Sequence, residues 1–172
     1  DDSFLILLNR NYESEDFQDL TRFTGSVQID YRTAPWLTNR LVVGTDEVRE
    51  DNQSITERSE LLQIFSPSEL GGKNVSRRDV SYNTVDYSGT INLNLNPELT
   101  SQTSLGAQYY RRLTRFVGAN GQDFVLPGLR AVNAAAVRTG SESYFENTTV
   151  GVFVQEELGW RDRVFFTAAI RA

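Results

Sequence analysis

The sequence of 172 residues contains no cysteine, no histidine and no methionine. Without these residues the chain has no disulfide, no zinc cluster, no thiol nucleophile and no histidine base, so we expect neither a metal site nor a catalytic triad. The net charge is −6 at pH 7, and no basic surface indicates binding to nucleic acid.

Long hydrophobic runs are also missing. No stretch approaches the ~20 apolar residues of a transmembrane helix. The first residues, DDSFLILLNRNY, are led by acids and have only a short apolar stretch, which does not fit a signal peptide. Because the sequence also lacks an initiating methionine, we expect it to be a fragment of a longer, mature protein.

The dominant pattern that is present is alternation of apolar and polar residues with a period of two. The stretch YSGTINLNLNPELTSQTSLGAQYY, residues 87–110, shows it twice around an Asn-Pro break. Such alternation is typical of a strand with one apolar and one polar face. The sequence predicts an all-β, antiparallel up-and-down meander of about six long strands, over residues 23–32, 37–48, 84–96, 99–112, 149–159 and 163–172. The apolar FLILL run, residues 4–8, is a candidate for the end of a preceding strand.

The predicted connections alternate between short turns and two long polar loops, at residues 49–83 and 113–148. Each predicted strand spans about ten residues, which is the length that a tilted strand needs to cross a bilayer. Short turns on one side and long loops on the other are typical of an outer-membrane barrel, as are aromatic residues near strand ends. The residues of this last kind are Tyr31, Trp36, Tyr87, Tyr109 and Trp160.

If the strands cross a membrane, their apolar face contacts lipid and their polar face lines a lumen. This hypothesis requires that no second layer of the chain buries Val27, Ile29, Ile91 and Leu93. Six strands are too few to close a barrel, so the chain would be part of a larger wall. Glu156 departs from the pattern, because it falls on the apolar face. Either a bulge shifts the register there or the carboxylate lies close to the membrane interface.

Two segments resemble the SusC/RagA-like group of TonB-dependent outer-membrane receptors. One is the strand–turn–strand RFTGSVQIDYRTAPWLTNRLVVGTDEV. The more specific one is GVFVQEELGWRDRVFFTAAIRA, whose matching positions are Val154, Gln155, Trp160, Arg161, Asp162, Arg163, Thr167 and Arg171. The resemblance runs from about residue 20 to the end of the chain and is weakest in the two long loops.

The resemblance implies a bacterial outer-membrane protein with a barrel of twenty-two strands around an N-terminal plug, which imports oligosaccharides, peptides or other bulky nutrients. The implied partners are the rest of the barrel and its plug, the TonB complex through an N-terminal part absent from this sequence, outer-membrane lipid and, in many members, a surface lipoprotein lid. This chain would be an internal segment of the wall, without enzymatic activity and without a cofactor.

Two sets of residues are candidates for contact with a solute. The first set falls on the predicted lumen face and consists of Asp30, Arg32, Asp86, Asn92, Asn94 and Gln108. Alternatively, these are ordinary wetted wall residues, since barrel interiors are generally polar. The second set comprises aromatic residues assigned to the second long loop, Tyr110, Phe116, Phe124, Tyr144 and Phe145. Their rings suit sugar or peptide capture, but they also suit a small core formed by the loop itself.

Two other functions fit parts of the sequence. The chain could be a soluble, secreted β-domain that binds a ligand through its two long loops. Its NQS, NVS and NTT motifs would then be glycosylation acceptors. A glycoside hydrolase that uses two carboxylates needs no histidine, yet the sequence places no two acids into an evident site.

Overall fold

We describe residues 14–58 and 70–172 of a computed structural model of the chain. The described residues form six strands and one short 3-10 helix: β1 (Ser14–Ala34), β2 (Leu37–Thr56), β3 (Gly72–Asn96), β4 (Leu99–Phe124), η1 (Val132–Ala134), β5 (Ala135–Trp160) and β6 (Val164–Arg171). The FLILL run lies outside the described residues. No helix in the described ranges is long and apolar enough to cross a membrane.

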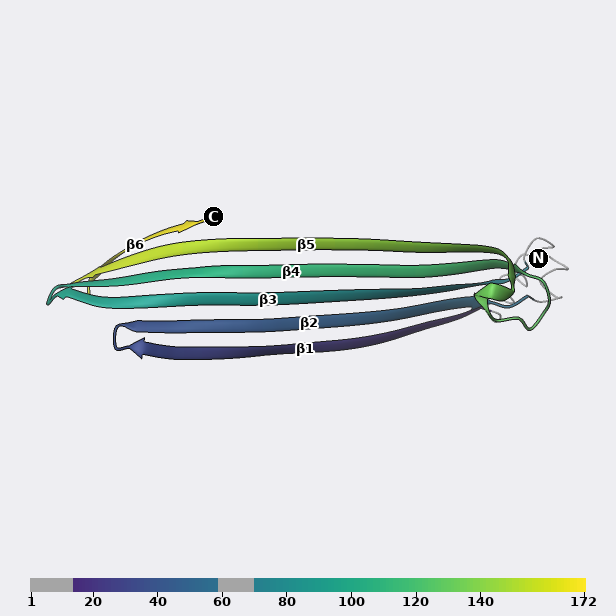
Figure 1. Cartoon of the computed structure of the whole chain (residues 1–172), viewed down its shortest axis with the longest axis horizontal. Coiled ribbons are helices and arrows are strands. Elements are labelled where there is room, and N and C mark those ends of the chain that lie inside the picture. The colour runs from purple at the N-terminus through teal and green to yellow at the C-terminus, as the bar shows by residue number, and fades with distance from the viewer. Residues whose placement is uncertain (1–13, 59–69) are drawn as a thin grey trace, which may run out of the picture. The chain divides into compact units, whose positions relative to one another are not determined.

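The six strands form one sheet in which each strand pairs with its neighbours in chain order, β1-β2-β3-β4-β5-β6 (Figure 1). The predicted all-β, up-and-down meander is therefore confirmed. The register between β5 and β6 is regular from Phe153↔Arg171 to Trp160↔Val164. β1 and β6 are the edge strands, so each has only one paired neighbour within the described sheet.

The short connections are tight turns with suitable chemistry. Pro35 and Pro97 lie in the turns β1–β2 and β3–β4, where a missing backbone N–H costs no sheet hydrogen bond. In the β5–β6 turn, Arg161 and Asp162 adopt positive φ angles of 54° and 53°. The Arg163 amide donates to the Trp160 carbonyl at 3.1 Å. Two consecutive positive φ angles match the twist of a two-stranded hairpin, which explains the role of the WRDR motif as a turn.

The two long loops predicted at residues 49–83 and 113–148 are a point to correct, because most of their residues belong to strands. β2 continues to Thr56 and β3 already begins at Gly72; β4 continues to Phe124 and β5 begins at Ala135. In these extensions apolar residues such as Val117 and Val137 are scattered among polar ones on both faces. The extensions therefore lack the apolar alternation by which a sequence reveals a strand. Cross-strand polar pairs hold them together instead.

Contacts divide the chain into two compact units, which we treat separately. Unit 1 consists of Asp1–Arg22, Val48–Val80 and Thr114–Phe145, and unit 2 consists of Phe23–Glu47, Ser81–Leu113 and Glu146–Ala172. The predicted membrane strands fall almost entirely in unit 2. Unit 1 contains the strand extensions and the connection that carries η1.

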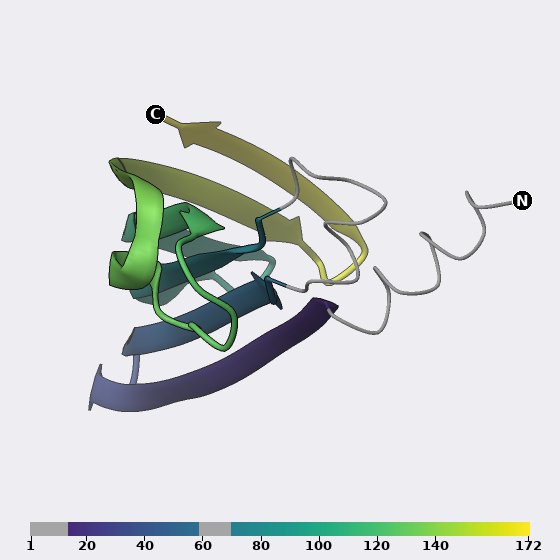
Figure 2. The same ribbon diagram turned by 90° about the vertical axis from the view of Figure 1, so that its right-hand side faces the viewer.

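Unit 1 has a small apolar core. Ile55, Phe124 and Ala135 are buried and pack together with Leu129. The connection between β4 and β5, which carries η1 in green, closes this end of unit 1 (Figure 2). A Cβ atom at Gly121 would lie 2.9 Å from the Ala135 Cβ and from the Val132 carbonyl oxygen, so only glycine permits this close approach.

Unit 2 has no comparable core. All of the buried apolar side chains in the described ranges belong to unit 1. The strands of unit 2 form a single layer, and no other described segment covers either of its faces with a second layer. The free energy that stabilises unit 2 therefore has to come from hydrogen bonds within the sheet and from whatever contacts its faces.

Candidate functional site

One face of unit 2 is apolar and exposed. Pairing in register places Val154 opposite Ile170 and Leu158 opposite Phe166, so β5 and β6 present these side chains on one face. Exposed residues of the same alternating sets continue this face across the other strands: Phe23, Val27, Ile29, Tyr31, Val43, Val85, Tyr87, Leu93, Leu95, Leu105, Val150 and Val152. We call this set, together with Val154, Leu158, Phe166 and Ile170, the apolar face.

The four residues singled out from the sequence remain uncovered by any described segment. Val27, Ile29 and Leu93 are 64%, 55% and 42% exposed, and Ile91 is half-buried among its neighbours in the sheet. A soluble single-layer sheet would have to leave this large contiguous apolar surface in water, which monomeric soluble proteins rarely do. The geometry instead fits a surface that contacts lipid or another apolar layer.

Glu156 lies on the apolar face without any shift of register, since it pairs with Ala168 in the regular ladder. The proposed bulge is therefore wrong. Its two carboxylate oxygens accept hydrogen bonds from Ser101 and Thr103 on β4, each at 2.5 Å. These two hydroxyl groups reduce the cost of holding an acid among apolar side chains, because they replace part of its hydration.

The opposite face of unit 2 is polar and carries cross-strand hydrogen bonds. Thr24 donates to Asp46 at 2.8 Å, and Thr90 and Ser104 lie 3.3 Å apart. The six residues predicted to face a lumen belong to alternating positions on this side of their strands: Asp30, Arg32, Asp86, Asn92, Asn94 and Gln108. Their contact with a solute or with another protein segment remains a prediction.

A cavity of about 490 Å³ opens on the polar face. Its polar lining comes from four different strands, with Arg40 on β2, Asp86 and Ser88 on β3, Gln108 on β4 and Arg171 on β6. The structure thus brings together two of the predicted lumen residues, Asp86 and Gln108. The other four predicted lumen residues do not line this cavity.

Two arginines dominate the charge of this cavity. Arg40 donates to the Gln28 side-chain oxygen at 2.8 Å, and Gln28 in turn donates to Asp30 at 2.6 Å. Arg171 donates to the Gln108 side-chain oxygen at 2.9 Å. Both arginines lie on the surface of the sheet, and each is held in place by a neutral amide.

Gly106 lies next to Phe153, which lines the same cavity. A Cβ atom at this position would lie 2.5 Å from a ring carbon of Phe153 and 2.5 Å from the Tyr87 carbonyl oxygen. The absence of a side chain allows the Phe153 ring to approach the backbone of β4 closely. Phe153 and Val42 give the cavity an apolar part beside its charged groups.

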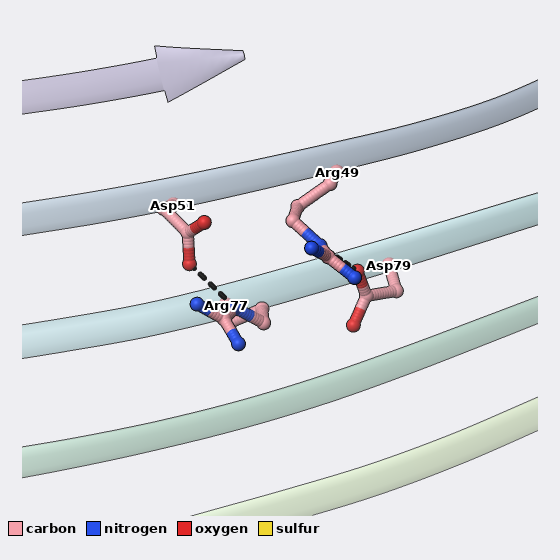
Figure 3. Close-up of polar contacts among 4 residues, drawn as sticks. All are labelled: Arg49, Asp51, Arg77 and Asp79. Carbon is pink, nitrogen blue, oxygen red and sulfur yellow. Dashed lines mark hydrogen bonds and ion pairs between the residues drawn. The ribbon is translucent and has the colours of Figure 1, made fainter. Parts of the chain in front are cut away.

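In unit 1, two ion pairs join β2 to β3. Arg49 pairs with Asp79 at 3.0 Å and Arg77 pairs with Asp51 at 2.6 Å, in neighbouring rows of the sheet (Figure 3). The hydrogen bond to Asp51 raises the pKa of the Arg77 guanidinium. Opposite charges placed directly across from one another favour this register of β2 against β3.

Ion pairs also join the connection after β4 to β1 and to the residues that follow β2 in unit 1. Arg130, in the connection after β4, pairs with Glu57 at 2.6 Å and with Glu15 on β1. The hydrogen bond to Glu15 is the main reason why the pKa of the Arg130 guanidinium is raised. The side-chain amides of Asn52 on β2 and Gln18 on β1 donate to the Glu50 carboxylate and lower the pKa of its carboxyl.

A groove of about 700 Å³ also lies in unit 1. It runs across four strands and mixes apolar residues such as Phe17 and Val117 with the charged groups of Asp19, Asp51 and Arg77. No group of acidic residues in the described ranges is arranged to hold a metal ion.

The predicted aromatic residues do not form one site. They lie on strands rather than in a loop, and Phe124 is fully buried in the core of unit 1, so its ring is not free to stack on a solute. Tyr110 lies in unit 2, where its ring centroid is 6.1 Å from that of Tyr82. Phe116 is half-buried, whereas Tyr144 and Phe145 are exposed and project from opposite faces of β5.

Arg40 and Arg171 were not among the predicted site residues. The sequence contains a signal for each, because Arg40 falls on the polar side of its strand and Arg171 is one of the positions that match the SusC/RagA-like pattern. Their convergence depends on the alignment of strands that are far apart in the sequence. A single sequence does not show how its strands pair, so it does not reveal this alignment.

No protein-family profile and no curated protein matches the sequence. Solved structures do match the fold. A structure of the RagAB peptide transporter superposes with a TM-score of 0.83 at 10% identity, and the match covers 93% of this chain and 18% of the other. The RagAB peptide importer gives TM-scores of 0.82 in its open-open state and 0.78 in its closed-closed state, with the same identity and coverage.

The present chain thus spans 18% of the length of these RagAB chains. At 10% identity, the similarity establishes the fold. The resemblance to the SusC/RagA-like group that the sequence motifs indicated is therefore confirmed at the level of the fold: the six-stranded sheet is folded like a section of the RagAB transporter.

Proposed function

We propose that this chain is a section of the barrel wall of a SusC/RagA-like, TonB-dependent receptor in the bacterial outer membrane. The whole receptor imports a bulky nutrient, such as an oligosaccharide or a peptide, and carries out no catalysis. Its partners are the remaining strands of the barrel, an internal plug, the TonB complex, a surface lipoprotein and outer-membrane lipid.

The observation that carries this proposal is the exposed apolar face of unit 2, opposite a polar face in the same single layer. Transmembrane barrels have this arrangement, with apolar residues toward lipid and polar residues toward the lumen. The similarity to structures described as peptide transporters supports import, and it favours transport over catalysis.

The alternative, a soluble secreted binding domain, rested on two long loops that display a ligand site. Much of those two segments forms strands. A soluble domain would also need a second layer over Val27, Val152 and Ile170. The described ranges contain no such layer, so we favour the receptor.

Site-directed spin labelling of β3 tests the proposal. Because this chain has no cysteine, single cysteines at successive positions from 85 to 95 can be labelled with a nitroxide in the full-length protein, provided that its other regions are also free of cysteine. In lipid vesicles we expect accessibility to oxygen, which concentrates in lipid, to be high at the odd-numbered positions. Accessibility to a water-soluble nickel chelate should be higher at the even-numbered positions.

A soluble domain predicts a different result. Labels accessible to oxygen would then also be accessible to the nickel chelate. The protein would stay in the aqueous fraction after membrane sedimentation. Labels at positions 161 and 162, in the β5–β6 turn, provide the control because the turn is exposed to water under both hypotheses.

A further inference from the structure

The cavity on the polar face of unit 2 contains two arginines, Arg40 and Arg171, whose described hydrogen bonds go to neutral groups. Five other arginines of the described ranges form ion pairs with carboxylates, namely Arg49, Arg77, Arg111, Arg130 and Arg161. The hydrogen bonds of Arg40 and Arg171 go to the neutral amides of Gln28 and Gln108. Within the described ranges, neither guanidinium forms an ion pair.

Each guanidinium therefore keeps unused hydrogen-bond donors. Arginine has five N–H groups in a planar fork, and one bond to an amide oxygen leaves most of them available. The fork matches the two oxygens of a carboxylate, and such charged bonds are stronger than bonds to a neutral amide. The cavity thus offers two cationic forks that lack an anion.

The remaining polar groups of the cavity complete the set. The Gln108 side-chain oxygen accepts from Arg171, which leaves its NH2 group as a further donor, and the Ser88 hydroxyl lines the same space. Asp86 is the single acid in the lining, so the two arginines leave one positive charge in excess. A volume of about 490 Å³ accommodates a small organic ligand or an acidic side chain.

We propose that this cavity is a carboxylate-binding site, in which Arg40 and Arg171 donate hydrogen bonds to the bound carboxylate and Gln108 and Ser88 contribute neutral donors. Asp86 weakens the binding of an anion and favours ligands that carry a positive charge near the carboxylate. Phe153 and Val42 contact the aliphatic part of the ligand.

The carboxylate can come from two sources, and the distinction rests on the proposed function. In a receptor, the polar face of unit 2 lines the lumen. The bound group is then either the carboxylate of a passing solute or an acidic side chain from another segment of the same protein that occupies the lumen. Both sources use the same chemistry at Arg40 and Arg171.

Calorimetric titration of the full-length protein in detergent micelles with glutarate tests for a free ligand, and the neutral diamide glutaramide serves as the matched probe. We expect glutarate to bind and glutaramide not to bind. The substitution Arg40→Gln or Arg171→Gln should weaken glutarate binding about tenfold or more, because each removes a charged hydrogen bond. Asp86→Asn should tighten binding, and Arg163→Gln, in the exposed β5–β6 turn, is the control.

Thermal unfolding tests for an acidic side chain of the same protein. If that side chain already occupies the cavity, the wild type does not bind glutarate. The double variant R40Q/R171Q should then unfold at a clearly lower temperature than R163Q. This difference should shrink between about 0.05 M and about 1 M NaCl because ionic contacts are screened by salt, whereas the lost bonds to neutral amides are not.

The proposal is overturned if the wild type binds no glutarate and the double variant shows no salt-dependent loss of stability beyond that of R163Q. Binding of glutaramide as strong as that of glutarate would overturn it as well. A negative spin-label result would refute the proposed receptor function but leave the glutarate titration valid, so the two proposals can fail separately.

Discussion

Unit 1 and unit 2 are formed by consecutive stretches of the same long strands, yet they differ in where their apolar side chains lie. Unit 1 buries Ile55, Phe124 and Ala135 in a small core and leaves other apolar residues scattered on both faces. Unit 2 buries none of its large apolar side chains and collects them on one face. Scattered apolar residues are normal in water, whereas a continuous face requires an apolar neighbour.

The comparison shows where each unit gets its stability. Unit 1 has what a water-exposed sheet needs, namely a core, a connection closed by Arg130 and ion pairs that fix its register. Unit 2 depends on its surroundings, because its apolar face gains free energy only when lipid or protein covers it. Three substitutions test this difference, and they are given from the largest expected effect to the smallest.

The first substitution, Phe124→Ala, removes the largest side chain of the unit 1 core. We expect unit 1 to lose about 3–5 kcal/mol, since a large cavity replaces a fully buried ring. Hydrogen exchange of the full-length protein should then speed up in the ends of β4 and β5 before it changes in β6. Phe145→Ala, at an exposed position of β5, is the control and should have little effect. A similar cost for both variants would contradict the presence of a specific core.

The second substitution, Val152→Arg, places a charge on the apolar face of unit 2. In lipid vesicles we expect a destabilisation of about 2–4 kcal/mol, the cost of an arginine near the middle of a lipid-facing strand. Denaturant unfolding from vesicles measures it. Gln155→Arg, on the opposite face of the same strand, should cost much less. Equal costs at the two positions would show that the two faces of β5 have the same environment.

How much of this comparison the sequence reveals differs between the units. Alternation identified the strands of unit 2 and its two faces, because these strands keep one side apolar along most of their length. The strand extensions of unit 1 have no such requirement, so their polar sequence looked like loops. Here the extended conformation depends on partners such as Asp79 for Arg49, which only the register of the sheet brings together.

The candidate sites show the same limit. Asp86 and Gln108 were predicted to face a lumen because the period of two assigns them to a face. The cavity that they share with Arg40 and Arg171 requires the alignment of four strands. The sequence left open whether the ring of Phe124 captures a solute or packs in a small core, and the structure places it in a core. The neighbouring Asp123 adopts a positive φ of 63°, and the sequence gives no signal for this conformation because aspartate adopts several.

The third test exchanges charges in the ion pairs of unit 1. R49D alone removes the pair with Asp79 and brings two carboxylates together, which should cost about 0.5–1 kcal/mol because both side chains are partly exposed. The double exchange R49D/D79R should recover most of this loss. A double-mutant cycle from denaturant unfolding measures the coupling. A coupling of zero would show that the pair does not help to fix the register of β2 and β3.

The positions of β1 and β6 at the two margins of the sheet have a consequence for handling this chain in the laboratory. Each margin carries a row of backbone N–H and C=O groups that can form hydrogen bonds with a further strand. If residues 1–172 are produced by themselves, we expect copies to stack margin to margin into heterogeneous polymers, and dilution or edge-capping peptides should slow this growth. Such polymers would not crystallise readily.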